Sequence, residues 1–279
     1  MSATPDRTRP PRDEARFYTI DGRRLPSVTT ILSVIAKPGL GPWYAREERR
    51  HFETAMLEVA SRYRILTGEQ LLDAVIQAVD GVKAADREKQ RAARIGTAVH
   101  AAIEWHLRTR RGEDAGPALR LADAAQWAVE AWQDWARAVD LEPLAIERVV
   151  ACVVCGYAGT LDLYARVRGV LSVLDWKVSR AIYPEAFLQN VAYRHAATRL
   201  GLPSDQGLIV RLPKVLGDPA FEPQWVPDTV VLDDFLAALR LWRWARQMAG
   251  RPTGDGAATG GQDPRAAPPG AVLAHRGRR

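Results

Sequence analysis

The pattern of apolar residues changes once along this chain, near Pro143, and that change constrains the fold more than any other feature. From about Trp43 to Asp140, apolar residues recur with the spacing of amphipathic helices, and helix-forming residues dominate. From Pro143 onward, short runs rich in Val, Leu, Ile and Tyr alternate with turn residues. The sequence therefore predicts a mainly helical N-terminal half that leads into a β-rich C-terminal half.

Glycine- and proline-containing breaks divide these halves into individual elements. The helices expected in the first half are Trp43–Leu66, Glu69–Val79, Ala84–Arg110 and Leu121–Val139. The second half predicts strands at residues 145–154, 157–167, 170–178 and 207–213, with helices at Pro184–Leu200 and Asp233–Met248. The predicted fold class is α/β (α+β), with a central mixed β-sheet flanked by helices.

The chain of 279 residues is long enough for one large domain or two small ones. We predict one ordered domain over residues 17–249, with a mainly helical part at 17–140 and an α/β core at 141–249. Residues 1–16 and 250–279 are predicted to be disordered, because their polar, Pro- and Gly-rich composition cannot offset the entropy of ordering. The second of these segments forms a basic tail.

Charge and cysteine content exclude some classes of protein but do not choose a partner. The net charge is +6, from 39 Lys and Arg against 33 Asp and Glu, and half of it lies in the basic tail. With no signal peptide and no apolar run near the roughly 20 residues of a membrane span, we expect a cytoplasmic protein without a membrane partner. Cys152 and Cys155 are too few for a zinc or iron–sulfur site, so we expect neither and interpret both as buried strand residues.

A tight turn is predicted at Arg168-Gly169, since glycine supplies the positive φ that two-residue hairpin turns need. With the turn centred there, Asp162 lies directly opposite Asp175 on one face of the sheet. Strand alternation places Lys177 on that face as well. Both strands are apolar on their two faces, as in a sheet covered on each side, so the two carboxylates need something to neutralise them.

Oxygen ligands that converge from two strands suit a hard divalent cation such as Mg²⁺ or Mn²⁺. A lysine beside such a cluster can orient a water molecule or stabilise the charge that develops during phosphoryl transfer. Alone, the D-x-K motif describes an ordinary ion pair on a strand surface. The apolar surroundings and the facing carboxylate of Asp162 favour a metal site instead.

Further motifs occur in a fixed order around this hairpin. They are P-S-V-T-T at 26–30, G-T-x-x-H at 96–100, G-T-x-D at 159–162, D-W-K at 175–177 and Q-x-x-x-Y at 189–193. Together, over about residues 24–212, they resemble the PD-(D/E)XK nuclease superfamily, and more closely its RecB-like and lambda-exonuclease-like branch of phages and bacteria. The resemblance implies a restriction-endonuclease-like core.

The resemblance implies a metal-binding role for four residues and a catalytic role for a fifth. Asp162 and Asp175 resemble the two metal-binding carboxylates of the superfamily. His100 and the main-chain carbonyl of Trp176 resemble additional metal ligands, and Lys177 resembles the catalytic lysine.

The resemblance is less complete at the remaining positions. Gln189 and Tyr193, four residues apart on one helix face, resemble the pair that positions the nucleic-acid strand or the lysine. Val178 stands where many relatives carry Thr. The leading carboxylate of the pattern has two secondary candidates, Glu104 and Glu147.

The resemblance implies a metal-dependent DNA nuclease that hydrolyses phosphodiester bonds with Mg²⁺ or Mn²⁺. We expect an exonuclease acting in DNA recombination, repair or phage DNA processing, with an endonuclease of the same fold as the alternative. A non-catalytic DNA-binding or assembly protein that retains the fold is a further alternative. DNA is the expected partner. No G-x-x-x-x-G-K-[ST] motif of a helicase occurs in this sequence. A helicase or a single-strand annealing protein that acts with this protein would therefore be a separate chain.

Overall fold

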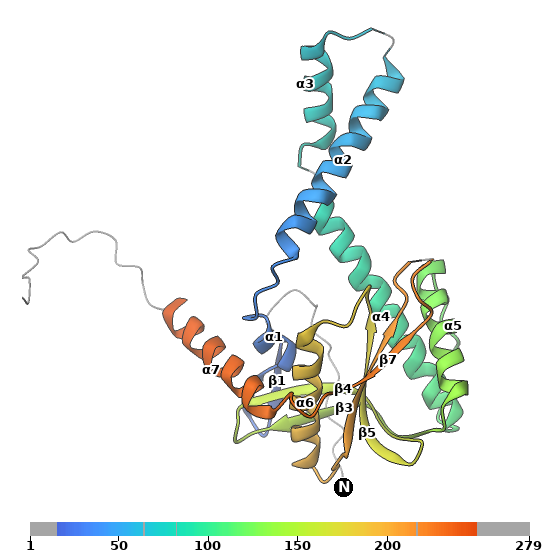
Figure 1. Ribbon diagram of the computed structural model, residues 1–279, viewed down its shortest axis with the longest axis vertical. Coiled ribbons are helices and arrows are strands. Elements are labelled where there is room, and N and C mark those ends of the chain that lie inside the picture. The colour runs from blue at the N-terminus through green and yellow to red at the C-terminus, as the bar shows by residue number, and fades with distance from the viewer. Residues whose placement is uncertain (1–15, 64, 82, 216, 250–279) are drawn as a thin grey trace, which may run out of the picture.

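The computed structural model describes residues 16–63, 65–81, 83–215 and 217–249 (Figure 1). Its N-terminal half contains a short hairpin and five helices: β1 (Phe17–Ile20), β2 (Arg23–Pro26), α1 (Val28–Leu32), α2 (Leu40–Arg62), α3 (Gly68–Val79), α4 (Ala84–Arg110) and α5 (Asp123–Ala138). Its C-terminal half contains β3 (Leu141–Cys152), β4 (Tyr157–Val167), β5 (Val170–Val178), α6 (Pro184–Thr198), β6 (Gln206–Leu212), β7 (Glu222–Trp225) and α7 (Leu232–Ala249).

The main sheet has five strands in the order β3-β4-β5-β6-β7. The strands β3, β4 and β5 form an antiparallel meander, β6 runs parallel to β5, and β7 is antiparallel to β6. The parallel step is made by α6, which connects β5 to β6. The predicted α+β class, with a mixed sheet flanked by helices and a helical N-terminal half, is confirmed.

Helices cover both faces of this sheet. On one face α4 and α5 enclose the largest apolar cluster, in which Trp176 of β5 packs edge-on against Trp132 and Trp135 with ring centroids 6.0 and 5.5 Å apart. On the other face α1, α6 and α7 cover a second cluster built around Tyr157 and Phe235. Asp175 and Lys177 alternate with Trp176 along β5 and therefore belong to the α6 face.

The α2–α3 hairpin stands away from the sheet in Figure 1. A small apolar cluster of Ala55, Val59 and Val75 holds the two helices together. The second helix begins with a capping box, in which Thr67 accepts a hydrogen bond from the backbone N–H of Gln70 and the Gln70 side chain accepts one from the N–H of Thr67.

Among the described residues, no helix combines the length and apolar character needed to cross a membrane.

The helix and strand predictions hold within a few residues, and Ala84–Arg110 and residues 157–167 and 170–178 match exactly. The prediction of a strand over 145–154 is wrong at its end, because β3 stops at Cys152 and a turn follows. Cys152 is a buried residue at the end of β3, as predicted. Cys155 instead lies half-buried in the turn and is disulfide-bonded to Cys152, so its interpretation as a buried strand residue is wrong. Four short elements were not predicted from the sequence: β1, β2, α1 and β7.

The two segments predicted to be disordered lie outside the described residues, apart from Arg16. Arg16 extends the first hairpin, where its carbonyl accepts a hydrogen bond from the backbone N–H of Ser27 at 2.8 Å. The Ser27 side chain in turn caps α1 by accepting from the N–H of Thr30 at 3.0 Å. The P-S-V-T-T segment therefore provides the N-terminal cap of α1.

Candidate metal centre and active site

The hairpin of β4 and β5 has the predicted register. Its turn residues Arg168 and Gly169 both have positive φ, 51° and 82°, as a two-residue turn of this kind requires. The pairs run from Val167 opposite Val170 to Leu163 opposite Leu174, as predicted, and end one step before Asp162 and Asp175.

The backbone pairing stops one step short of the two aspartates. In its place the backbone N–H of Trp176 donates to the Asp162 Oδ2 at 2.8 Å. Asp162 is therefore held by a main-chain donor of the neighbouring strand, and its other oxygen, Oδ1, faces His100.

Three candidate metal ligands meet around Asp162. The Nδ1 of His100 lies 3.4 Å from the Asp162 Oδ1, and the Nε2 of the same ring lies 3.1 Å from the main-chain carbonyl oxygen of Trp176. One ligand atom each from His100, Glu147 and Asp162 falls within 4.8 Å of the others. An imidazole from α4 and carboxylates from β3 and β4 thus converge, which is a donor set that fits a divalent cation.

Glu147 has an unusual backbone at this point of β3. The pairs on either side, Ile146 with Leu163 and Arg148 with Leu161, place Glu147 opposite Asp162. Its φ is 47°, in the left-handed region that few non-glycine residues adopt within a strand. Such a conformation costs on the order of 1–3 kcal/mol and is common at functional sites. The departure from regular β structure occurs where the side chain joins the group of candidate metal ligands.

A second network surrounds Asp175. Its Oδ2 lies 2.5 Å from the Lys177 Nζ, and its Oδ1 accepts from the Gln189 Nε2 at 2.7 Å. The Gln189 Oε1 accepts from the Lys177 Nζ at 3.0 Å, and its Nε2 lies 3.2 Å from the hydroxyl of Tyr193. Gln189 therefore connects the carboxylate and the ammonium group, and α6 sets the position of both.

Gly159 of the G-T-x-D motif is required by the close approach of Tyr193. A Cβ at this position would lie 2.3 Å from the ring carbon Cε1 of Tyr193, well inside van der Waals contact. The neighbouring Thr160 side chain is 3.0 Å from the hydroxyl of Tyr18, which ties the N-terminal hairpin to β4.

The environment separates the pKa values of the two aspartates. Burial raises the pKa of Asp175 to about 6, against the opposing effect of Lys177 and with a further upward contribution from Asp162. Burial also acts to raise the pKa of Asp162, but His100, Lys177 and the Trp176 N–H outweigh it and hold that pKa below its usual value.

His100 is charged more readily than an ordinary histidine. Burial alone would lower its pKa, but the carboxylates of Asp162, Glu147 and Asp175 together raise it above the ordinary value. Three acidic groups therefore lie near one imidazole and the ammonium group of Lys177, and a bound divalent cation would add further positive charge beside the carboxylates.

The structure brings most of the predicted site residues together, but in two groups. His100 contacts both Asp162 and the main-chain carbonyl of Trp176, whereas Asp175 contacts Lys177. The helix residues Gln189 and Tyr193 join the second group. Both aspartates therefore have hydrogen-bond or ion-pair partners within the protein.

The two secondary candidates have different surroundings. Glu147 belongs to the group around Asp162. Glu104 instead forms an ion pair with Arg108, one turn further along α4, at 2.9 Å. Glu147 is therefore the better candidate for the leading carboxylate.

Sequence reasoning missed a second cluster on the α6 face of the sheet. Ligand atoms of Cys152, Cys155 and His195 lie within 4.8 Å of one another. The C-x-x-C spacing was visible in the sequence, but His195 comes from α6 and no local pattern connects it to the cysteines.

Comparisons with known proteins leave the family open. No family model matches this chain, and no curated protein matches it. A solved structure titled "Crystal structure of SSO0001" is similar over 54% of this chain and 74% of its own, with 12% sequence identity and a TM-score of 0.30.

Proposed function

We propose that this protein is a metal-dependent nuclease that hydrolyses phosphodiester bonds in DNA. The observation that carries the proposal is the convergence of His100, Glu147 and Asp162 beside the ion-paired Asp175 and Lys177. A bound cation can activate water, and an ammonium group can offset the charge that develops on a phosphate, so these two adjoining groups together suit hydrolysis of a phosphodiester.

The donor set supports Mg²⁺ or Mn²⁺ as the cofactor. Carboxylate oxygens are the preferred ligands of both ions, and an added imidazole is compatible with Mn²⁺. We propose that Asp162, Glu147 and His100 hold the ion, with Asp175 and the Trp176 carbonyl as further ligands. When bound, such an ion polarises the scissile phosphate and lowers the pKa of the attacking water.

The other residues would act through charge and position. The side chain of Lys177 is 27% exposed, so its ammonium group would reach a phosphate oxygen or a water molecule while Asp175 and Gln189 hold it in place. In that position it would orient the nucleophile or offset the negative charge that develops on the phosphate. Tyr193 would keep Gln189 in the orientation that serves both partners.

We infer an exonuclease, on the resemblance of the ordered motifs to the lambda-exonuclease-like branch, and a role in DNA recombination, repair or phage DNA processing. DNA would be the partner of this protein. A separate helicase or annealing protein would be a further partner, and the protein would act in the cytoplasm. Some basic side chains outside the site are paired within the chain, since Arg50 pairs with Glu47, and both Arg108 and Arg111 pair with Glu113.

Cleavage of end-labelled linear DNA and of closed circular DNA, with Mg²⁺ or Mn²⁺, tests the proposal. We expect stepwise degradation of the linear DNA, loss of activity with EDTA, and a loss of at least about 10²-fold in Asp162→Asn and Lys177→Met. Asp73→Asn on the exposed face of α3 and Lys214→Met are matched controls, because the Lys214 side chain is 22% exposed and ion-paired outside the site.

Cleavage of circles as fast as linear DNA would identify an endonuclease. Full activity in both site variants, or in EDTA, would refute the assignment of the active site.

A further inference from the structure

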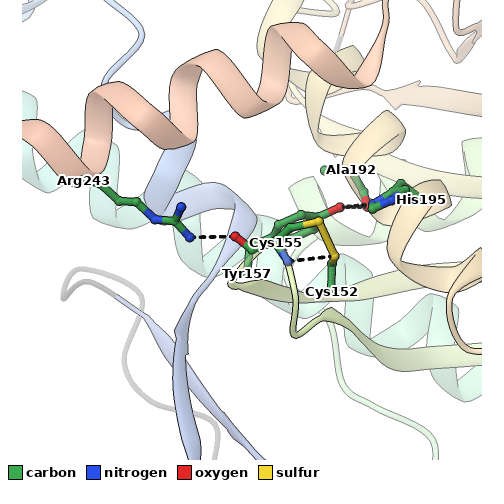
Figure 2. Close-up of a disulfide and its surroundings, with 6 residues drawn as sticks. All are labelled: Cys152, Cys155, Tyr157, Ala192, His195 and Arg243. Carbon is green, nitrogen blue, oxygen red and sulfur yellow. Dashed lines mark hydrogen bonds between the residues drawn. A yellow bond between two sulfur atoms is a disulfide. The ribbon is translucent and has the colours of Figure 1, made fainter.

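The turn between β3 and β4 holds two sulfur atoms close together. Cys152 ends β3 and Cys155 lies three residues later in the turn, where the two are disulfide-bonded (Figure 2). The backbone N–H of Cys155 donates to the Cys152 Sγ at 3.1 Å, and the N–H of Gly156 donates to the Cys152 carbonyl at 2.7 Å. This C-x-x-C-G turn, with Gly156 at φ 79°, presents both sulfurs on one side.

A histidine of α6 faces the same place. A ring nitrogen of His195 lies within 4.8 Å of both sulfur atoms. The hydroxyl of Tyr157 donates to the Ala192 carbonyl at 3.1 Å and lies 2.7 Å from the Nδ1 of His195 (Figure 2). Because its one proton goes to Ala192, the Tyr157 oxygen is left to accept from Nδ1, which fixes the ring beside the sulfurs.

Reduced, this cluster has the ligand chemistry of a transition-metal site. Two thiolates and an imidazole are the donors that Zn²⁺ prefers, and backbone N–H donors to a cysteine sulfur stabilise its thiolate form. Hard ions such as Mg²⁺ select oxygen donors instead. From the sequence we predicted no zinc site, because only two cysteines were visible as ligands. The third donor, His195, comes close to them only in the folded chain.

We propose that Cys152 and Cys155, when reduced, form with His195 a binding site for a borderline-soft divalent cation of the Zn²⁺ class. The three side chains leave a fourth position of a tetrahedral ion to solvent or an added ligand. The ion would link the β3–β4 turn to α6. Disulfide and metal exclude one another, since a sulfur in the disulfide is not a thiolate.

The test is a Co²⁺ titration of the full chain after reduction by a phosphine under argon. Reduction consumes one phosphine and one water molecule: the S–S bond breaks, each sulfur takes a proton from the water, and the phosphine takes the water's oxygen and becomes its oxide. We expect a near-ultraviolet thiolate-to-Co²⁺ charge-transfer band that saturates at one ion per chain and disappears when Zn²⁺ displaces Co²⁺. The oxidised chain is expected to give no such band.

Two variants and one control locate the ligands. Cys155→Ser should abolish the two-thiolate band, and His195→Gln should weaken Co²⁺ binding on the order of tenfold or more. His106→Gln, on α4 and bonded to Gln133, should bind Co²⁺ as the wild type does. In the wild type, Zn²⁺ should also protect both cysteines from alkylation, which mass spectrometry reads without any substitution.

Absence of the band from the reduced chain, or unchanged binding in His195→Gln, would overturn the proposal. Equal alkylation of both cysteines with and without Zn²⁺ would do so as well. The result is independent of the proposed nuclease activity, because Co²⁺ bound by carboxylates and an imidazole gives no sulfur charge-transfer band.

Discussion

Asp175 should destabilise the metal-free protein at neutral pH. The side chain is 1% exposed, and burial raises its pKa from 3.8 to about 6 even though Lys177 lies beside it. Each unit of pKa difference between folded and unfolded chains corresponds to about 1.4 kcal/mol, so keeping Asp175 ionised costs the folded state up to about 3 kcal/mol. Asp175→Asn keeps the shape of the side chain and removes that cost.

The effect has a defined pH dependence. Because the pKa of Asp175 is higher in the folded chain, the folded state binds more protons, and this group lowers stability as the pH rises. The cost is absent below about pH 4, where the carboxyl is protonated in both states, and is complete above about pH 6. The advantage of Asp175→Asn should therefore appear between these values and remain constant above them.

Urea denaturation in EDTA, at pH 4.5 and at pH 7.5, measures the difference. We expect Asp175→Asn to exceed the wild type by about 1–3 kcal/mol at pH 7.5 and by well under half of that at pH 4.5. Asp73→Asn, on the exposed part of α3, should change little at either pH. A variant that is less stable than the wild type at pH 7.5, or an advantage that does not depend on pH, would refute the reasoning.

Three other substitutions test separate parts of the structure. Gly159→Ala should displace Tyr193, cost about 1–3 kcal/mol in urea denaturation and lower nuclease activity, because its Cβ would lie 2.3 Å from the tyrosine ring; wild-type stability would contradict the packing. Glu147→Gln should weaken Mn²⁺ binding at least about tenfold by calorimetry, and unchanged affinity would remove Glu147 from the ligand set. Trp135→Ala should cost about 3–5 kcal/mol, since the side chain is buried against Trp176, and a loss below 1 kcal/mol would argue against that core.

The register of the central hairpin was accessible from sequence because one turn determines it. Arg168-Gly169 fixes which residues of β4 and β5 face each other, and strand alternation then places Lys177 with Asp175. Amphipathic periodicity likewise gave both ends of α4, which carries His100. These are local rules, so they hold without knowledge of the rest of the fold.

Structural features that depend on residues distant in the sequence could not be predicted from the sequence. The left-handed backbone of Glu147 has no sequence signal, and the approach of His195 to the cysteines depends on how α6 packs. The β7 strand was missed because it is short, exposed and contains a proline. The β1–β2 hairpin did carry a signal, since Asp21-Gly22 is a favoured hairpin dipeptide with positive φ at both residues.

The most direct test is anomalous diffraction from crystals of the wild-type chain soaked in Mn²⁺. We expect a manganese peak in contact with the carboxylates of Asp162 and Glu147 and the imidazole of His100. A peak bound elsewhere, with these three side chains left as a hydrogen-bonded cluster, would contradict it.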